Sequence, residues 1–207
     1  QVAKKVFRPN KIYLLASSSG KLGKVHLHEW TRKVLLPNIG EESLLLVDSW
    51  SCYNDDSLRM ASEEQNKNLK IVMIPPKTTG MCQPLDRYFF RVYKNYYRKF
   101  SDFVLLHSIN VTLHLRDEII KIHSLIHNQF SSPRYVNTWK YAWFCCGYID
   151  DYEQFVNPTD FCFNNVPLTC SQLSCGEIPF LICSWCKSPL CFNHFYIDYH
   201  FCDDFDE

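Results

Sequence analysis

Cysteine and histidine residues cluster at the C-terminal end of the chain, and this cluster constrains the fold more than any other feature of the sequence. Nine of the eleven cysteines lie between Cys145 and Cys202, whereas only Cys52 and Cys82 precede them. A secreted protein held by disulfides would spread its cysteines through a short chain. Clustering with histidines instead favours a metal in a reducing compartment.

Eight residues of this cluster have the spacing of metal ligands: Cys170, Cys175, Cys183, Cys186, Cys191, His194, His200 and Cys202. Structural zinc takes four Cys or His ligands in a tetrahedron, so eight ligands predict two Zn²⁺ ions. A disulfide knot is the alternative, and the two histidines count against it. So short a segment cannot build a sufficient core alone, so we expect the metal to supply its folding energy.

From Cys183 onward the pattern CxxCxxxxCxxHxxxxxHxC resembles the cross-brace zinc finger of the AN-one type. Ligand pairs alternate between two ions in that family. The resemblance therefore implies one site made of Cys170, Cys175, Cys191 and His194, and a second made of Cys183, Cys186, His200 and Cys202. The first pair, Cys170 and Cys175, departs from the family's CxxC spacing. Cys162 is an alternative member of the first site.

The whole chain has the composition of a packed protein. Apolar residues make up 46% and aromatic residues 15% of its 207 residues, which argues against global disorder. Basic and acidic residues number 22 each, so the chain is not a uniformly basic nucleic-acid binder, although a local basic patch is compatible with this balance. No long uncharged apolar run occurs, so we expect no membrane span.

Short apolar runs separated by helical patterns predict an α/β fold. Strands are expected at residues 12–16, 44–47 and 71–74, and helices at 25–36, 86–100, 115–130 and 134–146. The run at 44–47 is typical of a central strand that is covered on both faces. Residues 147–176 look irregular, and we expect a domain boundary there.

Two aspartates lie where such a fold binds ligands. Asp48 ends the strand at 44–47, and Asp86 opens the helix at 86–100. Ligands of open α/β sheets bind at the carboxyl ends of strands. Two carboxylates brought together there would hold divalent cations, which support phosphoryl transfer. The alternative is structural, because Asp commonly caps loops and helix starts.

The segments around both aspartates resemble DDE superfamily transposases of the pogo and jerky-like branch. SLLLVDSW at residues 43–50 is similar to the strand with the second catalytic acid, and IPPKTTGMCQPLD at 74–86 resembles the PPxTTxxxQPLD segment with the third. The resemblance covers most of residues 11–150. It implies a ribonuclease-H-like fold, DNA as the partner, a nuclear location, and catalytic Mg²⁺ or Mn²⁺ bound by Asp48 and Asp86.

The family's first catalytic Asp has no counterpart in this sequence. Glu29, the acidic residue before Glu41, lies inside a predicted helix and is in the wrong place. We therefore expect this chain alone to be inactive, as a fragment or a decayed copy. Its N-terminus has neither an initiator Met nor the pattern of a signal peptide, so the chain is expected to begin inside a longer protein.

Four basic residues share one face of the predicted helix at 86–100: Arg87, Arg91, Lys94 and Arg98. Contact with DNA phosphates would give sequence-independent, salt-dependent affinity. The alternative is an ordinary amphipathic helix with a solvated basic face. Helical spacing assigns a second, aromatic face to Phe90, Tyr93, Tyr97 and Phe100. It leaves Tyr96 partly exposed.

These patterns together predict an α/β chain of three parts. They are a partial ribonuclease-H-like DDE transposase domain at 1–110, a helical extension at 111–150, and a linker, zinc-binding module and acidic tail at 151–207. The leading hypothesis is a transposon-derived DNA-binding protein, the remnant of a transposase that cleaves phosphodiesters and transfers strands. The alternative is a catalytically inactive interaction protein whose zinc module binds a protein partner.

Overall fold

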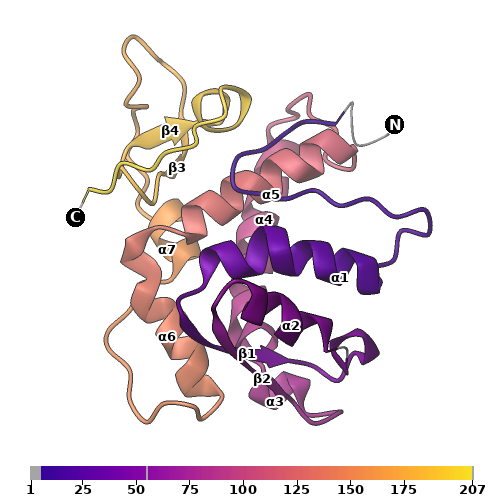
Figure 1. Cartoon of the computed structure of the whole chain (residues 1–207). Coiled ribbons are helices and arrows are strands. Elements are labelled where there is room, and N and C mark those ends of the chain that lie inside the picture. The colour runs from indigo at the N-terminus through magenta and orange to yellow at the C-terminus, as the bar shows by residue number, and fades with distance from the viewer. Residues whose placement is uncertain (1–5, 55, 207) are drawn as a thin grey trace. The chain divides into compact units, whose positions relative to one another are not determined.

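The computed structural model describes residues 6–54 and 56–206, and these residues form two compact units (Figure 1). The first unit contains the described residues of 13–83, and the second contains residues 6–12 and 84–206. Among the described residues, no helix combines the length and the apolar character needed to cross a bilayer. The three regions predicted at residues 1–110, 111–150 and 151–207 stay predictions.

A parallel pair of strands organises the first unit. Strand β1 (Glu42–Val47) pairs with β2 (Asn68–Met73) from Glu42↔Asn68 to Val47↔Met73. Between them lie a 3-10 turn, η4 (Ser51–Asn54), and helix α2 (Ser57–Glu64), which packs on β2. Parallel strands need such a crossover because the end of the first strand and the start of the second lie at opposite ends of the sheet.

Helical segments flank this pair. The predicted helix at 25–36 is present as α1 (Lys24–Trp30), the π-helical turn η2 (Thr31–Leu35) and the 3-10 turn η3 (Leu36–Asn38). The short helix α3 (Thr79–Cys82) follows β2. Both predicted strands at 44–47 and 71–74 are confirmed, although β2 begins three residues earlier than expected.

Two expectations for the first unit are wrong. Residues 12–16 form no strand, and Tyr13 and Leu14 are exposed. An apolar run becomes a strand only where a neighbour satisfies its backbone hydrogen bonds. Strand β1 is also not a central, doubly covered strand, because β2 is its partner in a two-stranded sheet and Leu44 is 53% exposed.

The second unit packs helices against a C-terminal β-hairpin. The helices at 86–100, 115–130 and 134–146 are confirmed as η5 (Leu85–Phe89) with α4 (Phe90–Leu106), α5 (Arg116–Phe130), and η6 (Pro133–Tyr135) with α6 (Val136–Cys145). Helix α7 (Pro158–Phe163) lies in the stretch expected to be irregular. Strand β3 (Pro179–Ile182) pairs antiparallel with β4 (Pro189–Cys191), and η7 (Asn193–Ile197) follows.

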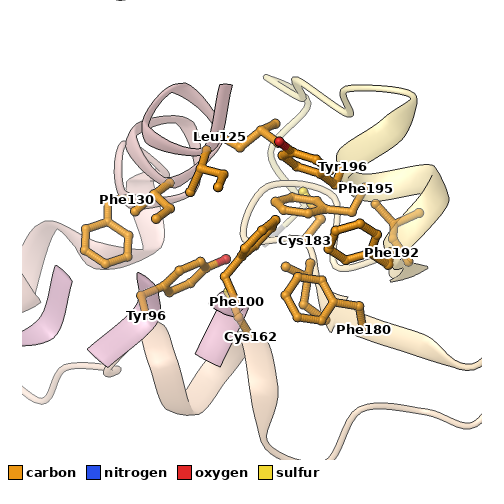
Figure 2. Close-up of a cluster of buried hydrophobic side chains, with 14 of the residues drawn as sticks. Tyr96, Phe100, Leu125, Phe130, Cys162, Phe180, Cys183, Phe192, Phe195 and Tyr196 are labelled. Carbon is orange, nitrogen blue, oxygen red and sulfur yellow. The ribbon is translucent and has the colours of Figure 1, made fainter. Parts of the chain in front are cut away.

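One hydrophobic core joins α4, α5 and the C-terminal hairpin, and Figure 2 shows its side chains meeting from these elements. Helix α4 contributes a stripe at four-residue intervals: Val92, Tyr96, Phe100 and Val104. The aromatic face predicted for this helix is therefore partly wrong. Tyr96 is fully buried, whereas Phe90 is 40% exposed.

The C-terminal segment shares its core with the helices, and the folding energy expected from the metal stays a prediction. The Phe100 ring lies 5.4 Å from Phe180, 5.3 Å from Phe192 and 5.0 Å from Tyr196, measured between ring centroids. Phe180, Phe192 and Tyr196 are themselves buried. Aromatic residues in the hairpin and in η7 thus find on α4 the apolar surface that so short a segment lacks.

Candidate metal centres and nucleic-acid interface

The first group of candidate ligands gathers around the end of β4. The ligand atoms of Cys170, Cys175, Cys191 and His194 all lie within 4.8 Å of one another. The Sγ atoms of Cys175 and Cys191 are 3.9 Å apart, and His194 Nδ1 lies 3.4 Å from Cys170 Sγ and 3.1 Å from Cys191 Sγ. Strand β4 and the turn η7 position Cys191 and His194, and a loop brings the first two cysteines to them.

The second group lies beside the turn that joins β3 to β4. The ligand atoms of Cys183, Cys186, His200 and Cys202 also lie within 4.8 Å of one another. Cys186 Sγ is 3.6 Å from His200 Nε2. The backbone N–H of Cys183 donates to Ser188 O at 2.9 Å, which fixes the turn that presents Cys183 and Cys186 together.

Both groups fit a tetrahedral metal ion and not a disulfide. Zn–S bonds of about 2.3 Å and Zn–N bonds of about 2.0–2.1 Å place tetrahedral ligand atoms about 3.5–3.8 Å apart. The separations of 3.1–3.9 Å in the first group and 3.6 Å between Cys186 Sγ and His200 Nε2 in the second lie around that range, whereas a disulfide needs about 2.05 Å. All eleven cysteines are free thiols. Three sulfurs and one imidazole make each group chemically suited to a divalent ion such as zinc.

The membership of the two groups is the alternating one implied by the cross-brace resemblance. Cys162 belongs to neither group. It is fully buried, with its Sγ 3.2 Å from Ser184 Oγ and 3.7 Å from the Tyr135 hydroxyl. Metal binding by the eight ligands stays a prediction.

Thiol ionisation, which metal binding requires, is favoured at one cysteine of each group. The hydrogen bond with Cys183 lowers the pKa of Cys186 to about 3, and the same hydrogen bond raises the pKa of Cys183. Burial raises the pKa of Cys170, but backbone N–H groups of Gln172 and Cys191 outweigh it and bring that pKa to about 7. A cation in each group would favour the thiolate further.

A carboxylate lies near the ring nitrogen of the first group's histidine that faces away from the sulfurs. Asp198 Oδ2 lies 3.9 Å from His194 Nε2, while His194 Nδ1 faces the sulfurs. Carboxylates in this position orient a metal-bound imidazole. Asp198 is not among the residues predicted from the sequence, although its place four residues after His194 within a helical turn was a usable signal.

Asp48 lies at the carboxyl edge of the parallel strand pair. It directly follows β1, and Ile74 N donates to Val47 O at 2.7 Å, so the pairing ends at this point. Asp48 Oδ1 accepts a hydrogen bond from Trp50 N at 3.0 Å, which is the loop cap that the structural alternative predicts. A carboxylate has about four lone-pair sites, so this bond leaves Asp48 able to bind a cation.

Asp86 and the basic residues lie at the start of the second unit. Asp86 occupies the first turn of η5 and is exposed. Arg87, Arg91, Lys94 and Arg98 are all exposed as well. The exposed state of the four cations is compatible with phosphate contact and equally with a solvated helix face.

Comparison with known families bears on the two hypotheses for the function, DNA binding and protein interaction. Residues 9–130, more than half of the chain, match the family model described as DDE superfamily endonuclease. The chain belongs to the DDE superfamily endonuclease family. Residues 143–202 match a second model, described as Tc5 transposase C-terminal domain. Comparisons with curated proteins and with solved structures gave no match.

The two matches divide the candidate residues of this DDE endonuclease chain. Asp48, Asp86 and the four basic residues lie within the endonuclease match, and all eight Cys and His residues lie within the Tc5 C-terminal match. Membership of the family implies the use of divalent metal ions. Both matches support a transposase-related, DNA-binding function, and neither supports the alternative of a protein-interaction module.

Proposed function

We propose that this DDE endonuclease chain is a transposase-derived DNA-binding protein in which Asp48 and Asp86 bind catalytic Mg²⁺ or Mn²⁺. The observation that carries the proposal is the position of Asp48 at the carboxyl edge of two parallel strands, inside the endonuclease match. Asp86 lies inside the same match. We assign the chain to the pogo and jerky-like branch and its first part to a ribonuclease-H-like fold.

Both carboxylates have a defined chemical task under this proposal. Asp48 and Asp86 would hold divalent ions, and such ions would supply activation of a water or a 3′-hydroxyl and neutralisation of charge at the phosphodiester. Asp48 and Asp86 supply hard oxygen ligands for these ions. The N–H group of Trp50 orients the Asp48 carboxylate through its 3.0 Å hydrogen bond.

The test is Mn²⁺ binding by variants of the full chain. Asp48→Asn and Asp86→Asn should each weaken Mn²⁺ binding by about tenfold or more, since changes beyond the ligands already cost about 10–100-fold in metal affinity. Electron paramagnetic resonance of free Mn²⁺ measures this directly. Asp203→Asn, which changes an exposed carboxylate in the acidic tail, is the control. Wild-type Mn²⁺ affinity in both test variants would refute the assignment.

We further propose that each Cys₃His group holds one structural Zn²⁺ in a cross-brace arrangement. The support is the ligand chemistry and the gathering of all four ligand atoms of each group within 4.8 Å of one another. Such ions would close the hairpin and the turn η7 into a fixed shape. We also propose a nuclear location, which the resemblance to DDE transposases implies.

The exposed basic residues of η5 and α4 are the proposed phosphate contact. Residues 87–100 contain four basic stripe residues and no acidic residue. The buried stripe on the same helix fixes α4 in the core, so these cations project from a rigid support.

Changing Arg87, Arg91, Lys94 and Arg98 together to Ala should weaken binding to duplex DNA and flatten its salt dependence. Each phosphate contact contributes about 0.9 to the slope of log affinity against log salt, so loss of four contacts removes about 3–4 from the slope. Fluorescence anisotropy over a salt series measures it. The control changes four exposed cations elsewhere, Lys21, Lys33, Arg116 and Lys140, and should keep the wild-type slope. An unchanged slope in the stripe variant excludes phosphate contact by α4.

A further inference from the structure

Two consecutive carboxamides are buried at the end of α5. Asn128 and Gln129 both have no exposed surface. A buried amide destabilises the fold unless its donors and acceptor find partners. Gln129 Nε2 donates to Asn128 Oδ1 at 3.3 Å, and the other side-chain partners of both residues lie in the C-terminal metal-ligand segment, more than fifty residues away in the sequence.

Gln129 contacts the turn that carries two ligands of the second group. Its Oε1 accepts a hydrogen bond from Ser184 N at 2.6 Å, and its Nε2 donates to Cys183 Sγ at 3.6 Å. Cys183 is itself fully buried. The side chain of Gln129 therefore holds the backbone of the turn and faces the sulfur of one ligand at the same time.

Asn128 contacts both chain segments that carry the same ligand group. Its Nδ2 donates to Cys202 O at 2.8 Å, and its backbone carbonyl accepts a hydrogen bond from Trp185 Nε1 at 2.7 Å. Ser132 Oγ adds a 2.7 Å hydrogen bond to Ser184 O. The end of α5 thus contacts both chain segments that supply the second group.

We propose that Gln129 is a positioning residue of the second metal site, and this proposal rests on metal binding by that group. An N–H donor directed at a metal-bound thiolate offsets charge on the sulfur and fixes the orientation of the ligand. Gln129 lies in the endonuclease match, whereas Cys183 and Cys202 lie in the Tc5 C-terminal match. The last helix of the endonuclease match therefore contacts the second ligand group of the following match, and both belong to the second unit.

Two substitutions separate the two contacts of Gln129. Gln129→Met has a similar length and removes both the acceptor for Ser184 N and the donor to Cys183. Gln129→Glu keeps the acceptor but places a carboxylate against the thiolate. Gln154→Met changes an exposed glutamine and is the matched control.

The experiment follows zinc release from the zinc-loaded full chain to a chromophoric chelator in excess. We expect wild type and Gln154→Met each to release two ions, and the release rates of the variant should equal those of wild type. Both Gln129 variants should release one of the two ions about 10–100-fold faster. Cadmium-113 NMR of the cadmium-loaded chain should show that one of two resonances shifts in these variants.

The possible outcomes are distinguishable. Wild-type release of both ions by the Gln129 variants overturns the positioning role while leaving metal binding intact. Equal acceleration of both ions also overturns it, because that result indicates general destabilisation. A wild-type chain that retains no metal overturns both this proposal and the proposed zinc sites.

Discussion

Removal of metal should abolish the cooperative unfolding of residues 84–206. Structural zinc contributes about 10–16 kcal/mol of apparent binding free energy in zinc-finger peptides. A whole domain has about 5–15 kcal/mol of net stability. Because the hairpin and η7 share their core with α4 and α5, loss of the metal should also unfold these helices. A separate finger would unfold alone and leave the helices intact.

Circular dichroism with a zinc chelator measures this effect. We expect the chelated chain to lose its sharp thermal transition and much of its helical signal, and added zinc to restore both. Chelator that has been saturated with zinc beforehand is the control. An identical melting transition in chelator and in saturated chelator would show that the metal ligands do not support the fold.

Phe100→Ala should destabilise the zinc-loaded chain by about 3–5 kcal/mol, the usual cost of truncating a buried Phe. Phe100 is 1% exposed and touches three aromatic residues of the C-terminal segment: Phe180, Phe192 and Tyr196. The substitution leaves a cavity where α4 meets that segment. Urea denaturation in zinc-containing buffer gives the free energy of unfolding.

Leu105→Ala on the same helix is the matched control, because Leu105 is 72% exposed. Its effect should stay within about 0.5 kcal/mol. Equal stability of Phe100→Ala and Leu105→Ala would contradict a shared core. The free zinc concentration must be equal in all samples, because a ligand that binds only the folded state adds to apparent stability.

Local patterns in the sequence predicted most of the helices and both strands of the first unit. The helices at 115–130 and 134–146 agree with α5 and α6 within about two residues, because helical periodicity is carried by neighbouring turns. Helix α7 was missed, although Asn157 caps it by accepting hydrogen bonds from Thr159 N and Asp160 N and Pro158 follows at the first position. That Asn-Pro pair was a readable start signal.

Long-range features could not be predicted in this way. Complete burial of Tyr96 follows from packing of α4 against α5 and the distant C-terminal segment. The contact of Gln129 with Cys183 joins residues 54 positions apart, and no periodicity encodes it. The grouping of eight ligands into two sets was implied by family resemblance, since spacing alone gives several possible pairings.

Native mass spectrometry of the full chain, purified under reducing conditions, tests the metal centres most directly. We expect the mass of the chain with two zinc ions, one for each Cys₃His group. A metal-free chain under zinc-replete conditions, or one whose clustered cysteines are joined as disulfides, would contradict the metal centres.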